Sequence, residues 1–245
     1  MGRFAVLVLV GAASIGARAQ QPCEFFSDQA RQHLTQALQA APSCKDAAAQ
    51  FDKCRWGSSV DAEFGSIVVD KCEKELLPTL SAAGKANYEH ELRLCSYEFE
   101  HQEGTIYISE DAHCKVHVAA DFDANPDIAD QPPARASFDC AKAQSAVERA
   151  ICSDQKLGDA EIVLSRALHG AMSALRPAQK RALTKQENDW FSGVENKCRV
   201  GADAVSAAAR VCMRKQFEAR FLELDDCSSG ETAACLKLPE TGGNP

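Results

Sequence analysis

The sequence predicts an all-α fold made of two small disulfide-stabilised helical domains, and three observations predict it. Apolar residues recur at three- and four-residue steps through most of the chain, which is the spacing of a helix face. Strand-like character is confined to Thr105–Ile108, which is too short to assign. Twelve cysteines are spread along the chain, and a proline-rich stretch divides them into two groups.

The first 19 residues have the layout of a secretory signal peptide. Met1–Arg3 is a short basic region, Phe4–Val10 is apolar, and Ala17–Ala19 is a small-x-small cleavage motif. The apolar stretch is shorter than the roughly 20 residues that span a bilayer, and nothing downstream predicts a membrane span. We therefore expect an exported protein, periplasmic or extracellular, that is cleaved after Ala19.

Cysteine spacing and charge narrow the function classes. No two cysteines stand at the C-x-x-C spacing of zinc ribbons and redox sites, so structural disulfides are expected. The chain has 27 basic and 35 acidic residues, and loss of Arg3 and Arg18 with the signal peptide leaves a net charge of −10. This balance argues against nucleic acid or an anionic membrane surface as partner and is compatible with a basic protein.

Residues 125–136 are the expected linker. They contain Pro126, Pro132 and Pro133 and show no apolar periodicity, which predicts an extended spacer. The predicted organisation is a cysteine-rich helical domain of unknown function at 20–124, a second helical domain at 137–226, and a tail at 227–245.

Helix signals are clear on both sides of this linker. In the N-terminal domain, helical spacing covers 24–39, 60–77, 82–102 and 110–122. In the C-terminal domain, Ser145 and Glu148 form a capping box, Asp154 can cap a second helix, and Pro177 suits the first position of a third. A fourth helix follows from the apolar spacing between Val205 and Leu224.

An internal duplication is one further possibility. Cys54 and Cys152 are 98 positions apart, and so are the Asp-Ala-Glu triplets that begin at Asp61 and Asp159. These identities lie in helical, alanine-rich sequence, so chance and common ancestry both remain open.

The C-terminal domain also carries a more specific motif. It includes Phe138-Asp139-Cys140, then Glu148-Arg149-Ala150-Ile151-Cys152, and later Gln186 with Trp190, followed by Cys198, Cys212 and Arg220. On these residues, 137–226 resembles the lysozyme-inhibitor LprI-type domain family. The resemblance implies a small exported helical domain and, for the characterised branch, binding and inhibition of lysozyme. Where that family usually has an arginine-aspartate pair after its tryptophan, this chain has Val194-Glu195-Asn196.

This resemblance and the possible duplication also imply disulfide pairings. The family spacing implies Cys140–Cys152 and Cys198–Cys212, with Cys227–Cys235 closing the tail. The duplication suggests Cys44–Cys54 and a pair Cys72–Cys95 across a helical hairpin, which leaves Cys23 with Cys114. Other pairings of the six N-terminal cysteines stay open.

No catalytic motif is present, so neither an enzyme nor a cofactor is expected. His113 and His117, on either side of Cys114, place two imidazoles one helical turn apart, as in metal chelation. No third ligand stands at a spacing typical of metal sites, so two histidines on a solvated helix face are favoured and no metal site is expected. Trp190 lies on the apolar stripe of its helix and is expected in the core rather than against a sugar.

The sequence therefore predicts a protein-binding module, with lysozyme or a related cell-wall hydrolase as the first candidate partner. The candidate contacts are the acidic residues near the family motif, Glu148, Asp154, Asp159 and Glu161. The alternative is a structural or scaffold role in the bacterial envelope without inhibitory activity. Oligomeric state is not determined by the sequence.

Overall fold

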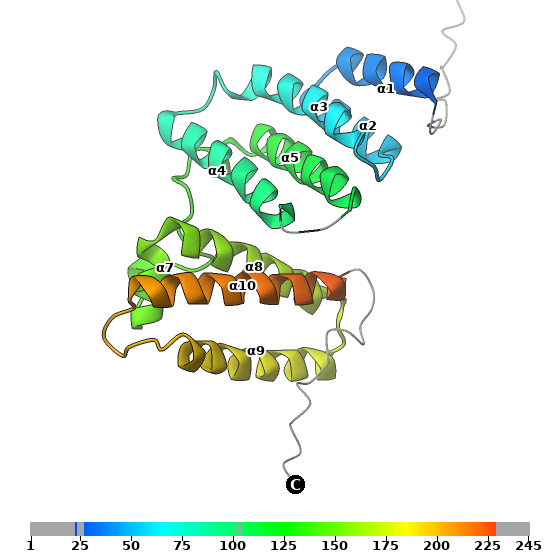
Figure 1. Cartoon of the computed structure of the whole chain (residues 1–245). Helices are drawn as coiled ribbons and strands as arrows, with labels where there is room; N and C mark the ends of the chain where they lie inside the picture. Colours follow the sequence, from blue (N-terminus) through cyan, green and yellow to red (C-terminus); the bar gives the residue numbers. More distant parts are fainter. Residues whose placement is uncertain (1–22, 24–26, 101, 103, 229–245) are drawn as a thin grey trace, which may run out of the picture.

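The computed structural model describes residues 23, 27–100, 102 and 104–228 of the 245-residue chain, and among these it is all-α (Figure 1). The helices form two groups, α1–α5 and α7–α10, which we call the N-terminal and C-terminal halves. The predicted signal peptide, residues 1–19, lies outside the described residues. The expected pair Cys227–Cys235 also lies outside them, because Cys235 is not described.

The N-terminal half consists of α1 (Asp28–Ala40), α2 (Cys44–Cys54), α3 (Asp61–Leu76), α4 (Ala82–Phe99) and α5 (Ile106–Ala124). Serine hydroxyls cap three of them: Ser27, Ser43 and Ser81 accept hydrogen bonds from the backbone amide of the third residue of α1, α2 and α4. Helix α2 was not expected from the sequence. Thr105–Ile108, the strand-like piece, lies at the start of α5.

The core of this half forms around α3 and α5. Phe51 of α2, Phe64 and Val68 of α3, and Val116 of α5 are completely buried in it. The two central helices approach closely at Gly65, where an added β carbon would lie 3.0 Å from the β carbon of Ala112. A small residue at position 65 therefore sets the spacing of this pair.

The disulfides of the N-terminal half differ from those expected. The structure forms Cys23–Cys54, Cys44–Cys72 and Cys95–Cys114. The expected pairs Cys44–Cys54, Cys72–Cys95 and Cys23–Cys114 were therefore wrong. Cys44 and Cys54 are the first and last residues of α2, so the helix itself holds them apart, and each bonds to a different neighbour.

The C-terminal half consists of η1 (Cys140–Lys142), α7 (Ala146–Ser153), α8 (Gln155–Ala174), α9 (Pro177–Lys197) and α10 (Ala207–Ser228). The predicted capping box of Ser145 and Glu148, the Asp154 cap and the position of Pro177 are all confirmed. The pairs Cys140–Cys152 and Cys198–Cys212 are present, as the family spacing implied.

The segment 125–136 is not an extended spacer. It contains the short helix α6 (Pro126–Ala129), because proline at the first helical position needs no amide partner. Its backbone packs on both halves: an added β carbon on Gly84 would lie 2.7 Å from the Ala129 oxygen, and one on Gly158 only 2.2 Å from the Arg135 oxygen. The absence of a side chain at these two glycines lets the segment lie against α4 and α8.

Helix α4 joins the two halves. Leu94 belongs to the C-terminal core, and the Tyr97 hydroxyl donates to Glu218 of α10 at 2.6 Å. Arg166 of α8 pairs with Glu91 at 2.6 Å. The halves therefore share both apolar and charged contacts.

The five disulfides found among the described residues indicate an oxidising, extracytoplasmic environment. Within the described residues, no helix combines the length and the apolar character needed to cross a membrane.

Candidate functional site

The four acidic residues proposed as partner contacts all have contacts within the chain. Glu148 accepts hydrogen bonds from the backbone amides of Ser145 at 2.8 Å and Gln144 at 2.7 Å. These two bonds favour the ionised carboxylate and lower the pKa of Glu148. Glu148 therefore helps to start α7.

Asp154 and Glu161 have comparable roles. Asp154 accepts a bond from the amide of Leu157 at the start of α8 and lies 3.8 Å from a guanidinium nitrogen of Arg210. Glu161 accepts from both the amide and the hydroxyl of Ser137, at 2.8 and 2.5 Å. The two carboxylates fix the start of α8 and the chain that leads into η1.

Asp159 lies at the junction of the halves. Its Oδ1 atom is 2.8 Å from Nε2 of His90, a side chain of α4 that is only 1% exposed, and accepts a hydrogen bond from the side-chain nitrogen Nε2 of Gln155 at 2.6 Å. This is a contact between helices, so Asp159 would have to break it to meet a partner fully. Recognition of another protein by these four residues stays a prediction.

Trp190 is half-buried rather than enclosed. Its ring lies 6.0 Å from that of Phe217, and the guanidinium of Arg220 lies 5.9 Å from its centroid. Arg220 in turn bonds Glu187 and Glu223. The indole ring thus packs against the core between α9 and α10, beside the Arg220 ion pairs, and is only partly buried instead of lying inside the core as expected.

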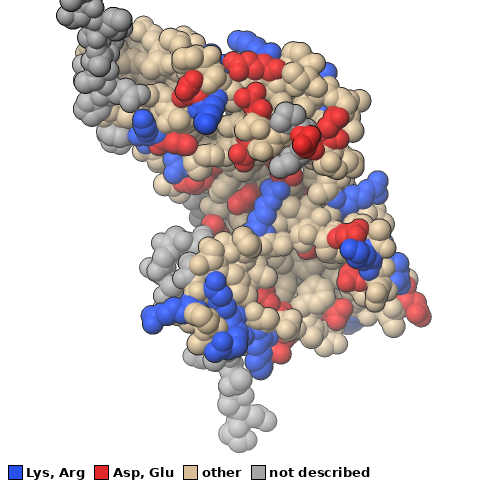
Figure 2. Space-filling model, turned by 180° about the vertical axis from the view of Figure 1, so that it is seen from behind, with Lys and Arg blue, Asp and Glu red and all other residues tan. Residues whose placement is uncertain are grey.

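The negative charge of the protein is concentrated in one half. Residues 20–124 carry 18 acidic and 9 basic side chains, a net charge of −9, whereas 137–226 carry 13 acidic and 14 basic ones, a net charge of +1. Residues 176–186, at the start of α9, hold four basic and no acidic side chains. Figure 2 shows basic groups gathered at one edge of the C-terminal half. The overall charge therefore did not identify which half is acidic.

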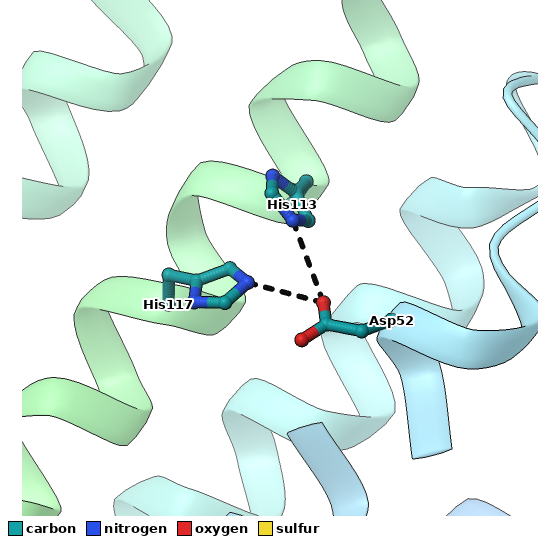
Figure 3. A group of neighbouring side chains, drawn as sticks. All are labelled: Asp52, His113 and His117. Atoms are coloured by element: carbon teal, nitrogen blue, oxygen red, sulfur yellow. Dashed lines mark hydrogen bonds and ion pairs between the residues drawn. The ribbon is translucent and has the colours of Figure 1, made fainter. Parts of the chain in front are cut away.

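A second cluster lies between α2 and α5 (Figure 3). Nε2 of His113 and Nε2 of His117 lie 3.4 and 3.1 Å from the same oxygen, Oδ1 of Asp52. The two imidazole rings meet edge to face with centroids 4.3 Å apart. Each of the three side chains is between 37% and 44% exposed, so the cluster is open to solvent on one side.

The surroundings of this cluster favour neutral His113. Burial, the neighbouring His117 and the positive charge of Arg55 lower its pKa, while Asp52 and Glu110 oppose the shift. Arg55 is itself paired with Glu110 at 2.9 Å. A neutral imidazole has a free nitrogen lone pair and can accept a proton or bind a metal ion.

Sequence reasoning found the two histidines but missed Asp52. The reason is that α2 was not recognised, so no helix was available to place an acid beside 113 and 117. The signal was present: Ser43 is a helix cap, and Ala47, Ala48 and Phe51 follow at helical spacing. An α2 prediction would have put Asp52 on the polar side of that helix.

Comparisons of the chain with models of known protein families, with curated proteins and with solved structures found no match. The resemblance of 137–226 to lysozyme inhibitors therefore rests on the quoted residues alone.

Proposed function

We propose that this protein is an exported helical module that binds another protein and has no catalytic role. The first candidate partner is a lysozyme or a related cell-wall hydrolase, as the resemblance of 137–226 implies. The observation that carries the proposal is the acidic balance of residues 20–124 on a scaffold held by disulfides.

Charge and rigidity both favour binding to a basic protein. Lysozymes are generally basic, and a partner with net charge −9 over one half would be drawn toward them and oriented by the field. Helices fixed by cross-links lose little conformational entropy on association. In this arrangement the N-terminal half supplies the attraction. The motif acids Glu148, Asp154, Asp159 and Glu161 mainly maintain the C-terminal helices.

The test is lysis of peptidoglycan-bearing cells by a c-type lysozyme, titrated with the oxidised mature protein. We expect inhibition that saturates near one-to-one, weakens as salt is raised, and is lost on reduction of the disulfides. Absence of inhibition at micromolar excess would reject lysozyme as the partner.

Two sets of variants separate the acidic surfaces. The triple change Asp70→Asn, Glu89→Gln and Asp121→Asn removes exposed acids of α3, α4 and α5, and we expect it to weaken inhibition and reduce its salt dependence. The comparison change at the motif is Glu161→Gln, which removes one acid of the C-terminal half and the charge that accepts from Ser137. Stronger loss from Glu161→Gln than from the triple variant would assign recognition to the motif instead.

A scaffold role in the envelope is the second candidate. It is favoured by the finding that the motif residues form caps, disulfides and ion pairs within the chain. A scaffold predicts no inhibition together with unchanged folding, which circular dichroism of the same samples would show.

A further inference from the structure

We propose that Asp52, His113 and His117 form a binding site for one divalent transition-metal ion of the zinc type. This goes beyond binding to a protein partner and does not depend on it. The three candidate ligand atoms come from two packed helices and all lie within 4.8 Å of one another.

The spacing of the ligand atoms fits a tetrahedral ion. Zinc bonds to nitrogen and oxygen are about 2.0–2.2 Å long, so two ligands of a tetrahedral site lie about 3.3–3.6 Å apart. The Nε2 atoms of His113 and His117 lie 3.4 and 3.1 Å from Asp52 Oδ1. The two nitrogens and the oxygen all lie within 4.8 Å of one another, so side-chain rotation that brings the nitrogens to the same spacing would place all three atoms around one ion.

The donor set selects the class of metal. Two imidazole nitrogens and one carboxylate oxygen suit Zn²⁺, Cu²⁺, Ni²⁺ or Co²⁺, whereas Mg²⁺ and Ca²⁺ prefer oxygen ligands throughout. Three protein ligands leave a fourth position for water, which the partial exposure of all three side chains allows.

The backbone around the site is held in place. Cys114, next to His113, is bonded to Cys95 of α4, and Cys54, two residues after Asp52, is bonded to Cys23. Because both helices are fixed close to their ligands, little ordering is needed when the ion binds.

The titratable groups at the site make metal binding depend on pH. Arg55 and Glu110 face His113 and pair with each other, and Asp52 is the carboxylate that contacts both imidazoles. Both histidines must be neutral to bind a metal ion, so the affinity should fall as the pH is lowered through the range where imidazoles gain a proton.

The same distances also describe a carboxylate that accepts hydrogen bonds from two imidazoles without any metal. The two arrangements differ in affinity for Zn²⁺, which can be measured directly. The experiment is a competition titration of ZnSO₄ between a chromophoric chelator and the oxidised mature chain, prepared without a histidine tag.

The wild-type chain should bind one equivalent of Zn²⁺, and a large excess of Mg²⁺ should not displace it. His113→Ala/His117→Ala should weaken this binding by about tenfold or more, since two of three ligands are gone. The control His33→Ala/His169→Ala removes two exposed histidines of α1 and α8 and should bind as the wild type does. The single change Asp52→Asn should give an intermediate loss, because the amide oxygen is a weaker ligand.

Thermal unfolding separates a lost ligand from a lost fold. Zn²⁺ should raise the melting temperature of the wild type and of the control variant, but not that of His113→Ala/His117→Ala. If the double variant does not fold, the comparison of Asp52→Asn with wild type decides the question. Equal zinc affinity in the wild type and the site variants, or no one-equivalent binding by the wild type, would overturn the proposal.

Discussion

Asp61 is a buried side chain whose replacement the structure predicts to be damaging. It is completely buried at the start of α3, and its carboxylate accepts three backbone hydrogen bonds, from Trp56 at 2.9 Å, Gly57 at 2.7 Å and Ser58 at 3.1 Å. The hydroxyl of Ser109, within α5, donates a fourth at 2.6 Å. One carboxylate thus holds the loop between α2 and α3 and fixes it to α5.

The magnitude follows from the donor that Asp61→Asn would leave without an acceptor. Asparagine keeps the size and one oxygen. With that oxygen at the position of Oδ2, it still accepts from Gly57, Ser58 and Ser109, but its amide nitrogen then faces the backbone amide of Trp56, which bonds to Oδ1. One unsatisfied buried donor costs about 1–3 kcal/mol, and the remaining bonds lose the charge of their acceptor, so we expect a loss of about 2–4 kcal/mol. For a chain of this size that corresponds to a fall in melting temperature of about 5–10 °C.

The assay is urea unfolding of the oxidised protein, followed by circular dichroism. The matched control is Asp70→Asn, an exposed acid on the same helix, for which a change within about 0.5 kcal/mol is expected. If Asp61→Asn lowered the free energy of unfolding by less than about 1 kcal/mol, the hydrogen-bond reasoning would be refuted.

Three further predictions concern packing, pH and cross-linking. Gly158→Ala should destabilise the protein by about 1–3 kcal/mol, because its β carbon would meet a backbone oxygen at 2.2 Å. Gly170→Ala, in open space on the same helix, should stabilise it by about 0.5–1 kcal/mol. Urea unfolding of both variants checks this, and equal effects would contradict it. Burial raises the pKa of Glu98 to about 7 from 4.5, so the native state keeps a proton that the unfolded chain has released, and stability should fall as pH rises between these values. Glu98→Gln should therefore match the wild type near pH 5 and exceed it at pH 8, and an equal difference at both pH values would count against this. Peptide mapping of the oxidised chain should recover the Cys44–Cys72 pair, and recovery of Cys44–Cys54 instead would show the pairing to be incorrect. Replacing both cysteines by alanine should lower the free energy of unfolding by about 3–4 kcal/mol, because the pair closes a loop with a sequence separation of 28.

Local signals predicted the C-terminal helices well. The capping box at Ser145, the Asp154 cap and Pro177 each depend on contacts within a few residues, so the sequence contains the whole interaction. The start of α5 was expected at residue 110, four residues too late. Serine commonly caps helices, but Ser109 lies inside α5 and its hydroxyl donates to buried Asp61. A tertiary contact took the place of the local one.

The sequence by itself determined the all-α class, most helix positions and the presence of disulfides, since these follow from apolar spacing, local capping and cysteine content. Only the tertiary structure decided which N-terminal cysteines meet, how 125–136 packs, and that Asp52 lies against His113 and His117. Those contacts join residues 19 to 65 positions apart, and their partners are chosen by the relative placement of helices. That placement depends on how all the apolar faces pack together, which no local stretch of sequence specifies.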